Sequence, residues 1–404
     1  MTTGETWMSA WLGAPRAYSA RLPLRLTAAA IALCVLMGGL VMTALAATAL
    51  LPASGRVVYV TAPTRARAGY LHLLDIDRGF VRPLFGLRPS VTYVAFGPDA
   101  RELVFVTEWE DVESRIYRAG LSGRSPVMLS TITHRDQFPT WSPDGTRLAY
   151  LSSQREGAWN LHVMDAGGSG VRRLSDLQVS AEPPAWSPDG TRLAVVSGGS
   201  IVVLDSQTGE VRLQIDPVAG MDDPPAPVGR AVDTGTGDVL GPSLRFASYS
   251  DLAWSPDGQT LAFIALRGRR AAVYAMQSDG ADVRRLTPAA IDVRSFVWSP
   301  DGARLALMAT VGDQADIFVQ DAACVVTPDG GQPLPAAGCA NPLRQLTDDL
   351  TFDWLPTWSP DGRWILFVSY RERVGKLFMT DDHGRFVQRL SQQALADFQP
   401  VWLR

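Results

Sequence analysis

The chain has 404 residues, a net charge of −4, 28 prolines and 36 glycines. This length exceeds one ordinary core and fits either several domains or a repeat array, and the many turn-forming residues suit a chain with many turns. Acidic and basic residues are interspersed, without a polybasic block or an acidic tail, so no nucleic-acid partner is predicted.

The N-terminal end has the pattern of a membrane anchor. No charged residue occurs from Leu26 to Leu51, and Arg21 and Arg25 precede this run. A helix over 26–51 would measure about 39 Å, enough to cross a hydrocarbon layer of ~30 Å. The preceding arginines place the N-terminus in the cytoplasm. We therefore predict four segments: a cytoplasmic segment 1–25, a transmembrane anchor 26–51, a linker 52–56 and an extracytoplasmic domain 57–404.

A cleaved signal peptide is the alternative, because Ala44-Leu45-Ala46 is a small-residue cleavage sequence after an apolar core. The apolar run is longer than a usual signal core and continues to Leu51, which favours the uncleaved anchor. Cleavage near Ala46 would give a secreted protein, and both interpretations place residues 52–404 outside the cytoplasm.

The pentapeptide Trp-Ser-Pro-Asp-Gly recurs along the rest of the chain. Copies begin at Trp141, Trp186, Trp254, Trp298 and Trp358, with a degenerate copy at Phe96 and a truncated one at Trp402. The spacings between these aromatic residues are 45, 45, 68, 44, 60 and 44. A period near 44 with four short apolar segments per unit is typical of a β-propeller.

Each unit is predicted to contain four strands. In the unit of Trp141, the first strand ends at the tryptophan, a tight turn follows, and further strands cover Arg147–Ser152, Asn160–Asp165 and Val171–Leu174. We interpret the tryptophan as filling the space between neighbouring blades and Asp-Gly as the turn. Because each unit has one copy, the copies are distributed around a ring and do not converge on a single site.

The two chain ends are predicted to share one blade. Strands at Val57–Thr61, Tyr70–Asp75 and Val81–Leu84 lack a first strand, whereas Gln399–Arg404 is a first strand with nothing after it. Pairing them closes the ring and removes open edges. The predicted fold is an all-β, seven-bladed β-propeller behind one transmembrane helix. The alternative is six blades, with the N-terminal strands packed elsewhere.

Two units carry insertions, Asp216–Tyr249 and Ala322–Pro342, which read as loops. Either could be a tolerated surface insertion or a partner-binding element. Cys324 and Cys339 flank the second insertion, and outside the cytoplasm this arrangement predicts a disulfide. Two free thiols are the alternative.

Sequence motifs for catalysis or metal binding are not found. His72 and His162 occupy a third-strand position that holds Tyr or Phe in other units, which indicates packing. His134 and His383 have no second histidine or cysteine at metal-ligand spacing. No G-x-S-x-G or H-E-x-x-H sequence occurs. We predict no catalytic residue, no metal and no cofactor.

The candidate site consists of polar residues just before each aromatic residue, where first strands are expected to enter the central channel. They are Asp136, Asp353 and Asp397 five positions before, Gln137, Glu182 and Arg294 four before, and Asp251 three before. Several carboxylates at one mouth could hold a cation or a basic group of a partner. A solvated, polar channel lining is the alternative.

The W-S-P-D-G-x-x-L/I-A/L pattern resembles the TolB-type propeller repeat, and it also occurs in the propeller domains of the prolyl-oligopeptidase and dipeptidyl-peptidase-IV-type families. The resemblance covers residues 57–404. It implies an extracytoplasmic propeller used for protein contacts or substrate gating, without a catalytic residue of its own.

These observations favour a membrane-anchored, non-catalytic binding scaffold whose partner is an envelope protein, a peptide or a carbohydrate. Two alternatives remain open. One is an enzyme at the channel mouth, a lyase or hydrolase that uses clustered carboxylates. The other is a gating propeller for a separately encoded peptidase.

Overall fold

The chain divides into two compact units, Met1–Pro52 and Ala53–Arg404, and all residues that the structure describes belong to the second. The predicted segment 1–25, the anchor 26–51 and most of the linker lie outside the described residues. Within the described part, no helix is long and apolar enough to cross a membrane. The computed structural model describes residues 55–62, 69–85, 91–109, 113–122, 126–130, 134–153, 157–216, 231–232, 239–240, 248–267, 270–312, 314–326, 333–334, 343–349, 351–372, 374–392 and 396–403.

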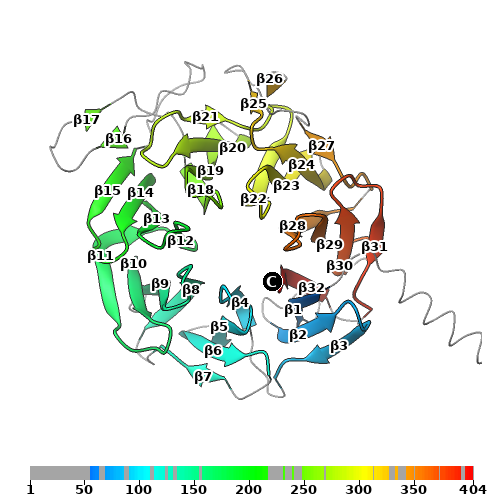
Figure 1. The fold of residues 1–404 in the computed structure, drawn as a ribbon, viewed down its shortest axis with the longest axis horizontal. Coiled ribbons are helices and arrows are strands. Elements are labelled where there is room, and N and C mark those ends of the chain that lie inside the picture. The colour runs from blue at the N-terminus through cyan, green and yellow to red at the C-terminus, as the bar shows by residue number, and fades with distance from the viewer. Residues whose placement is uncertain are drawn as a thin grey trace, which may run out of the picture. The chain divides into compact units, whose positions relative to one another are not determined.

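Antiparallel sheets surround a central opening, which makes the unit an all-β propeller (Figure 1). In four sheets the strands run outward from the centre in chain order. The first contains β4 (Val91–Phe96), β5 (Glu102–Trp109), β6 (Glu113–Gly120) and β7 (Val127–Met128). The second contains β18 (Ser248–Trp254), β19 (Thr260–Arg267), β20 (Arg270–Gln277) and β21 (Arg284–Arg285). The third contains β22 (Asp292–Trp298), β23 (Arg304–Val311), β24 (Gln314–Asp321) and β27 (Arg344–Gln345). The fourth contains β28 (Asp353–Trp358), β29 (Trp364–Ser369), β30 (Lys376–Asp381) and β31 (Val387–Arg389).

One larger sheet covers two consecutive repeats. Its first half contains β8 (Arg135–Trp141), β9 (Arg147–Ser153), β10 (Trp159–Asp165) and β11 (Arg172–Val179). Its second half contains β12 (Ala185–Trp186), β13 (Arg192–Ser197), β14 (Ser200–Asp205) and β15 (Val211–Ile215). Between the halves, the described strands pair only at Val179 and Ser197, because β11 continues to the position where a first strand would begin.

The predicted pairing of the two chain ends is confirmed. The closing sheet has the order β3 (Phe80–Pro83), β2 (Tyr70–Asp75), β1 (Arg56–Ala62) and β32 (Ala396–Trp402). Strand β32 is antiparallel to β1, with Val57 opposite Trp402 and Thr61 opposite Asp397. The C-terminal strand therefore becomes the innermost strand of the N-terminal sheet.

Each insertion contains a small ribbon, where only loops were predicted. Strands β16 (Ala231–Val232) and β17 (Val239–Leu240) pair in the first insertion, and β25 (Val325–Val326) and β26 (Pro333–Leu334) pair in the second. Cys324, directly before β25, is buried and disulfide-bonded. Its partner lies outside the described residues, so pairing with Cys339 remains a prediction.

The repeated pentapeptide forms a turn that fits against the preceding repeat. In the turn after Trp298, the Ser299 hydroxyl donates to Asp301 at 2.5 Å and accepts the N–H of Arg304 at 2.9 Å. Gly302 has φ +70°, and a Cβ there would lie 3.2 Å from Pro256 Cδ of the preceding copy. Glycine is needed both for the left-handed backbone and for this close approach.

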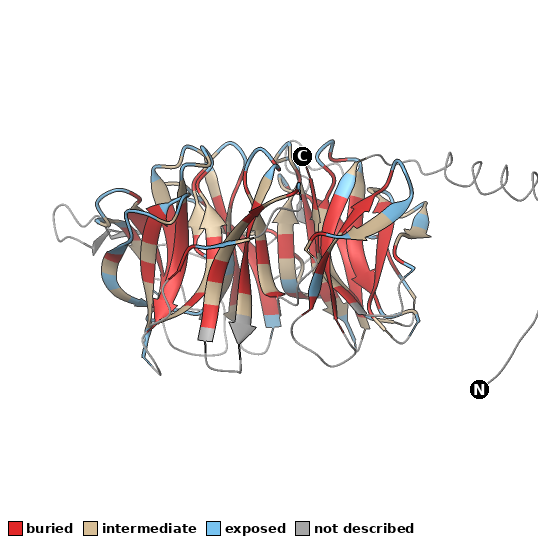
Figure 2. Cartoon of the chain, turned by 90° about the horizontal axis from the view of Figure 1, so that it is seen from below, coloured by how far each residue is buried: buried red, intermediate tan, exposed pale blue. Residues whose placement is uncertain are grey.

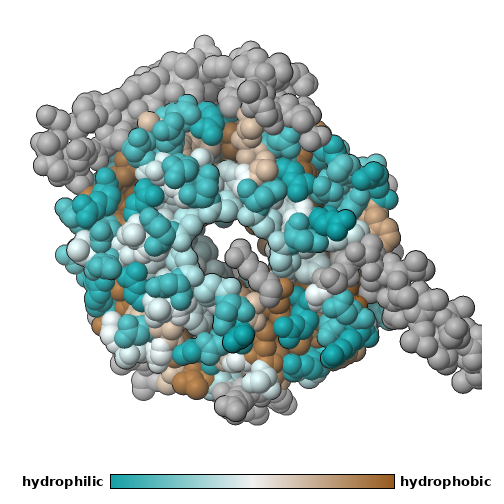
Figure 3. Space-filling model, in the orientation of Figure 1, coloured by the Kyte–Doolittle hydropathy of each residue, from teal (hydrophilic) through white to brown (hydrophobic). Residues whose placement is uncertain are grey.

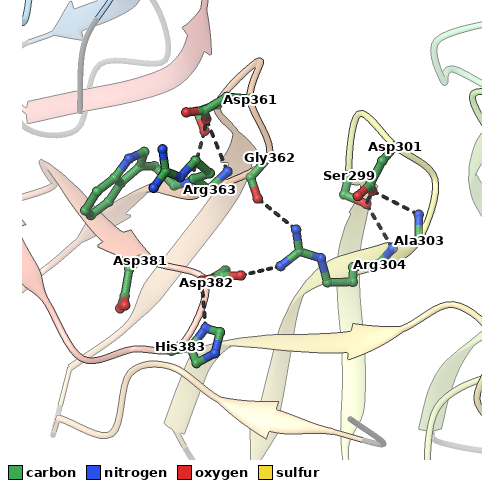
Figure 4. Close-up of polar contacts among 12 residues, drawn as sticks. Ser299, Asp301, Ala303, Arg304, Asp361, Gly362, Arg363, Asp381, Asp382 and His383 are labelled. Atoms are coloured by element: carbon green, nitrogen blue, oxygen red, sulfur yellow. Dashed lines mark hydrogen bonds and ion pairs between the residues drawn. The ribbon is translucent and has the colours of Figure 1, made fainter. Parts of the chain in front are cut away.

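Tryptophan and arginine of the repeat connect neighbouring sheets. The indole N–H groups of Trp141, Trp186 and Trp298 donate to inner-strand carbonyls of the preceding repeat. In the other direction, the Arg304 guanidinium lies 4.7 Å from the ring centre of Trp358 and donates to the Gly362 carbonyl at 2.8 Å and to Asp382 (Figure 4). The motif therefore has the structural role that its one-per-unit spacing indicated.

The apolar core lies between sheets, in layers of valine, leucine, isoleucine and phenylalanine from the second and third strands. Val203 of β14 and Phe263 of β19, for example, belong to one buried cluster that joins two neighbouring sheets. Seen from the side, the buried residues follow the strands, and the exposed residues gather at the turns (Figure 2). This packing leaves the inner edges of the first strands free to surround the central opening.

Candidate ligand-binding rim

The strands nearest the centre of the ring in Figure 1 are called the inner strands: β4, β8, β12, β18, β22, β28 and β32. Figure 3 shows an opening between them. We define the inner rim as the residues three and four positions before the aromatic residue that ends each inner strand.

Three predicted site residues do not line this opening. Asp136, Asp353 and Asp397 were expected to expose carboxylates at the channel mouth, and that expectation is wrong because their relative exposures are 3%, 0% and 1%. Each side chain points into the interface between two sheets.

These aspartates each pair with a hydroxyl from the end of the preceding repeat. Ser130 and Ser152 bond to Asp136, and Thr347 and Ser369 bond to Asp353. The hydroxyl of Ser391 donates to Asp397. We call these contacts the carboxyl–hydroxyl pairs.

Burial raises the pKa of all three carboxyl groups above the ordinary aspartate value, and the hydroxyl bonds oppose this shift. In every pair the Oδ1 atom is buried without a hydrogen-bond partner. The arrangement explains the aspartates as structural contacts between sheets.

A bulge in the inner strands explains why the aspartates turn away. The pairing of inner and second strands shifts between Gln137 and Thr140 in β8, and equivalent shifts occur in β18 and β28. A bulge places two residues opposite one and changes which side chains share a face. The residue five positions before the tryptophan then faces the neighbouring sheet.

The residue at the bulge has an unusual backbone. Of the six non-glycine residues with positive φ in the described part, four occupy this position, three before the aromatic residue. They are Phe138 (φ 53°), Asp251 (φ 49°), Leu355 (φ 54°) and Gln399 (φ 50°). Positive φ is uncommon outside glycine and an outlier for bulky side chains, and it costs roughly 1–3 kcal/mol.

One arc of the inner rim is aromatic and apolar. The rings of Tyr93 and Phe138, from β4 and β8, meet edge to face with centroids 5.6 Å apart. Gln399 of β32 donates to the Thr92 carbonyl of β4 at 2.9 Å. Burial raises the pKa of Tyr93 to about 12. With Leu355 of β28, these side chains come from four consecutive sheets.

The neighbouring arc is acidic. Glu182, just before β12, accepts a hydrogen bond from the backbone N–H of Asp251 in β18. Burial and the Asp251 charge raise the pKa of Glu182. The Asp251 side chain is exposed, but the protein around the channel desolvates its carboxylate and raises its pKa to about 6. Of the predicted site residues, the structure brings these two together.

The remaining predicted residues are not part of that pair. Gln137 is half-buried in β8, and the exposed Arg294 forms an ion pair with Asp292 of its own strand at 2.6 Å. Arg294 is thus already neutralised. Sequence reasoning missed Tyr93, Phe138, Leu355 and Gln399, because only polar residues were considered.

Histidines outside the rim have local partners. The His72 and His162 rings pack on Tyr59 and Tyr150, with centroids 5.8 Å and 5.6 Å apart, which confirms the packing interpretation. Burial lowers the pKa of both imidazoles.

His383 lies in a turn with two carboxylates. In the described part, potential ligand atoms of Asp381, Asp382 and His383 lie within 4.8 Å of one another. Asp382 is already bound by His383 at 2.7 Å and by Arg304 of the neighbouring sheet (Figure 4). This group is therefore explained by contacts between sheets.

Comparison with known proteins agrees with this architecture. Residues 52–225 match the family model described as PD40, the TolB beta propeller domain. This match covers less than half of the chain, and residues 52–225 are thus similar to the repeats of that family. No curated protein matches the sequence.

Several solved structures share the fold. Periplasmic gluconolactonase PpgL of Pseudomonas aeruginosa is 18% identical, with a TM-score of 0.54 over 87% of this chain and 100% of that chain. A chain from a study of two prolyl endopeptidases is 16% identical, with a TM-score of 0.50 over 76% of this chain and 43% of that one. TolB from Acinetobacter baumannii is 18% identical, with a TM-score of 0.49, 86% of this chain and 66% of that chain being covered. At these identities, the similarity to the first two structures shows the fold alone.

Proposed function

We propose that this TolB-like propeller is a non-catalytic binding scaffold that holds a partner at the inner rim. The supporting observation is the bulge shared by Phe138, Asp251, Leu355 and Gln399, where the backbone is the same and the side chains differ. Backbone strain that recurs at one position supports a functional role for that position. Side chains that vary on a constant scaffold are typical of a binding surface.

The compartment is part of the proposal. The uncharged run 26–51 and the arginines before it support a single-pass anchor with the propeller outside the cytoplasm. The partner would then be an envelope protein, a peptide or a carbohydrate. A protease-protection assay on sealed membrane vesicles tests this topology, because an extracytoplasmic propeller is protected in inside-out vesicles and exposed in right-side-out ones.

The number of blades is also part of the proposal, and we infer seven. Five four-stranded sheets and one eight-stranded sheet support this number, because the larger sheet divides into two repeats at the single pair Val179–Ser197. Each half contains its own pentapeptide turn, at Trp141 and Trp186. An experimental density map with six blades would contradict the proposal.

Partner binding is tested by changing rim side chains without changing the backbone. Asparagine tolerates the left-handed conformation, so the triple variant Asp251→Asn, Leu355→Asn and Gln399→Asn keeps the bulges and alters the surface. Affinity capture of the full-length protein from membranes, followed by mass spectrometry, should lose partners that the wild type retains.

The matched control uses the other two left-handed residues. Ala100 (φ 53°) and Asp282 (φ 52°) lie outside the inner strands. Ala100→Asn and Asp282→Asn should retain the captured partners. Equal recovery of partners by the triple variant and this control would count against the inner rim as the binding surface.

A further inference from the structure

We infer that the ligand of the inner rim carries a cationic group beside an apolar or aromatic group, as an arginine or lysine next to an aromatic residue does in an extended peptide. This inference rests on the proposed binding function and narrows its ligand class. Its basis is that the aromatic pair Tyr93–Phe138 lies on the two inner strands that precede the segments of the acidic pair Glu182–Asp251.

The two pairs come from consecutive parts of the ring. Phe138 is half-buried and packs against the core cluster that contains Val179, at the inner end of β11. The Thr140 hydroxyl of the same strand donates to the Pro184 carbonyl at 3.0 Å. Pro184 is two residues from Glu182, so the aromatic ring and the carboxylate lie on neighbouring segments of one rim.

The acidic pair lacks a cation within the protein. In the described residues neither Glu182 nor Asp251 forms an ion pair, and the Oε2 atom of Glu182 is buried without a hydrogen-bond partner. The basic residue of the inner rim, Arg294, is paired with Asp292. A partly desolvated carboxylate with one unpaired oxygen is costly, and a cation bound beside the pair would relieve part of that cost.

The aromatic pair adds a second reason for a cation. Tyr93 and Phe138, with ring planes at 81°, each pack against a core cluster and remain partly exposed, so part of the pair is accessible. Aromatic faces attract guanidinium and ammonium groups, and they bury apolar side chains. A guanidinium that bonds to a carboxylate also gains charge-assisted, bidentate hydrogen bonds. The rim thus matches both halves of such a ligand.

Two dipeptides that differ only in charge test the inference. The probes are acetyl-Phe-Arg-amide and acetyl-Phe-citrulline-amide, in which citrulline is the neutral counterpart of arginine. Isothermal titration with the purified full-length protein should give a Kd for the arginine probe that is lower by about tenfold or more. Higher salt should reduce this preference.

Two variants assign the preference to the rim. Glu182→Gln and Asp251→Asn should each remove most of the difference between the probes. Glu102→Gln and Asp282→Asn are matched controls, because these carboxylates already pair with Arg118 and Arg284. The controls should keep the wild-type preference.

The outcomes separate this inference from the proposed function. Equal binding of both probes would overturn the cationic ligand class, and so would a preference that survives Glu182→Gln and Asp251→Asn. Failure of both probes to bind at millimolar concentration would also overturn it. In each case the binding scaffold itself is judged by the capture experiment with the triple asparagine variant, which uses no probe.

Discussion

Replacing Thr347 by valine should show how much a carboxyl–hydroxyl pair contributes to stability. The Thr347 hydroxyl accepts a hydrogen bond from the N–H of Ile317 at 3.0 Å. It also lies within hydrogen-bond distance, as a donor, of the carboxylates of Asp316 and Asp353. Thr287 is the matched control: its hydroxyl accepts the N–H of Val273 at 3.0 Å, but Val293 occupies the position of the aspartate. Both threonines are buried, at 3% and 0% exposure.

Thr→Val keeps the shape of the side chain and removes the hydroxyl. In both variants a buried N–H loses its acceptor, which costs about 1–3 kcal/mol. In Thr347→Val a hydrogen bond to a charged group is lost as well, which adds about 1.5–3 kcal/mol. Urea denaturation at pH 7 should therefore place the midpoint of Thr347→Val clearly below that of Thr287→Val.

The pKa values of these carboxyl groups predict how the cost of Thr347→Val changes with pH. Burial raises the pKa of Asp353, and it raises the pKa of Asp316 to about 6. Both folded pKa values exceed the unfolded value near ~4, so the folded state binds more protons in this window and the unfolding free energy falls as pH rises from ~4 to ~6. The excess cost of Thr347→Val should shrink between pH 7 and pH 5, as the carboxylates that need the hydroxyl become protonated. A cost no greater than that of Thr287→Val at pH 7, or one that grows at pH 5, would refute the reasoning.

Three further predictions concern contacts between sheets. Gly302→Ala should lower the unfolding free energy by ~1–3 kcal/mol more than Gly312→Ala, measured by urea denaturation, because both have positive φ but only Gly302 meets a proline of the preceding turn. Deletion of residues 399–404 should abolish soluble folded protein, as judged by expression and circular dichroism, because it removes most of the strand that pairs with β1. Arg147→Met should lower the unfolding free energy by at least ~1 kcal/mol, because it removes the contact 5.0 Å above Trp186 and the hydrogen bonds to Ser206 and Gly190, and the tryptophan fluorescence should change.

Sequence reasoning recovered the architecture because every residue of the pentapeptide has a local or nearest-neighbour role. Ser299 and Asp301 close their own turn, Gly302 fits the preceding proline, and Trp298 reaches the preceding carbonyl. Each copy of the pentapeptide makes these contacts within its own turn and with the preceding repeat. The number of copies therefore follows the number of repeats. The pairing of β32 with β1 followed from the same count, because the N-terminal unit lacked a first strand and the C-terminal unit was a first strand alone.

Of the seven predicted site residues, three were wrongly expected to face the opening: Asp136, Asp353 and Asp397. Counting back from the tryptophan assumes that an inner strand alternates regularly, and a register change of one residue moves side chains to the opposite face. The bulge in β8 makes that change, so Asp136 enters the interface and Phe138 takes the unusual backbone. No residue at the bulge is glycine, and the sequence therefore contains no local sign of positive φ. This error does not apply to Glu182, because β12 has only two residues and Glu182 lies before the strand.

The distribution of roles along the inner strands indicates where a function can vary. The tryptophan is fixed by its neighbour's carbonyl and arginine, and the aspartate five positions earlier is fixed by a buried hydroxyl. A substitution at either place costs stability whatever the ligand is. The bulge between them is constrained in backbone but not in side-chain type, because it holds Phe138, Asp251, Leu355 and Gln399 at nearly the same φ. Variation confined to that position would change the ligand without unfolding the ring. Asparagine substitutions at the bulge should therefore alter binding without lowering the unfolding free energy, measured by urea denaturation, by more than about 0.5 kcal/mol. A larger loss would mean that the rim side chains support the fold rather than a partner.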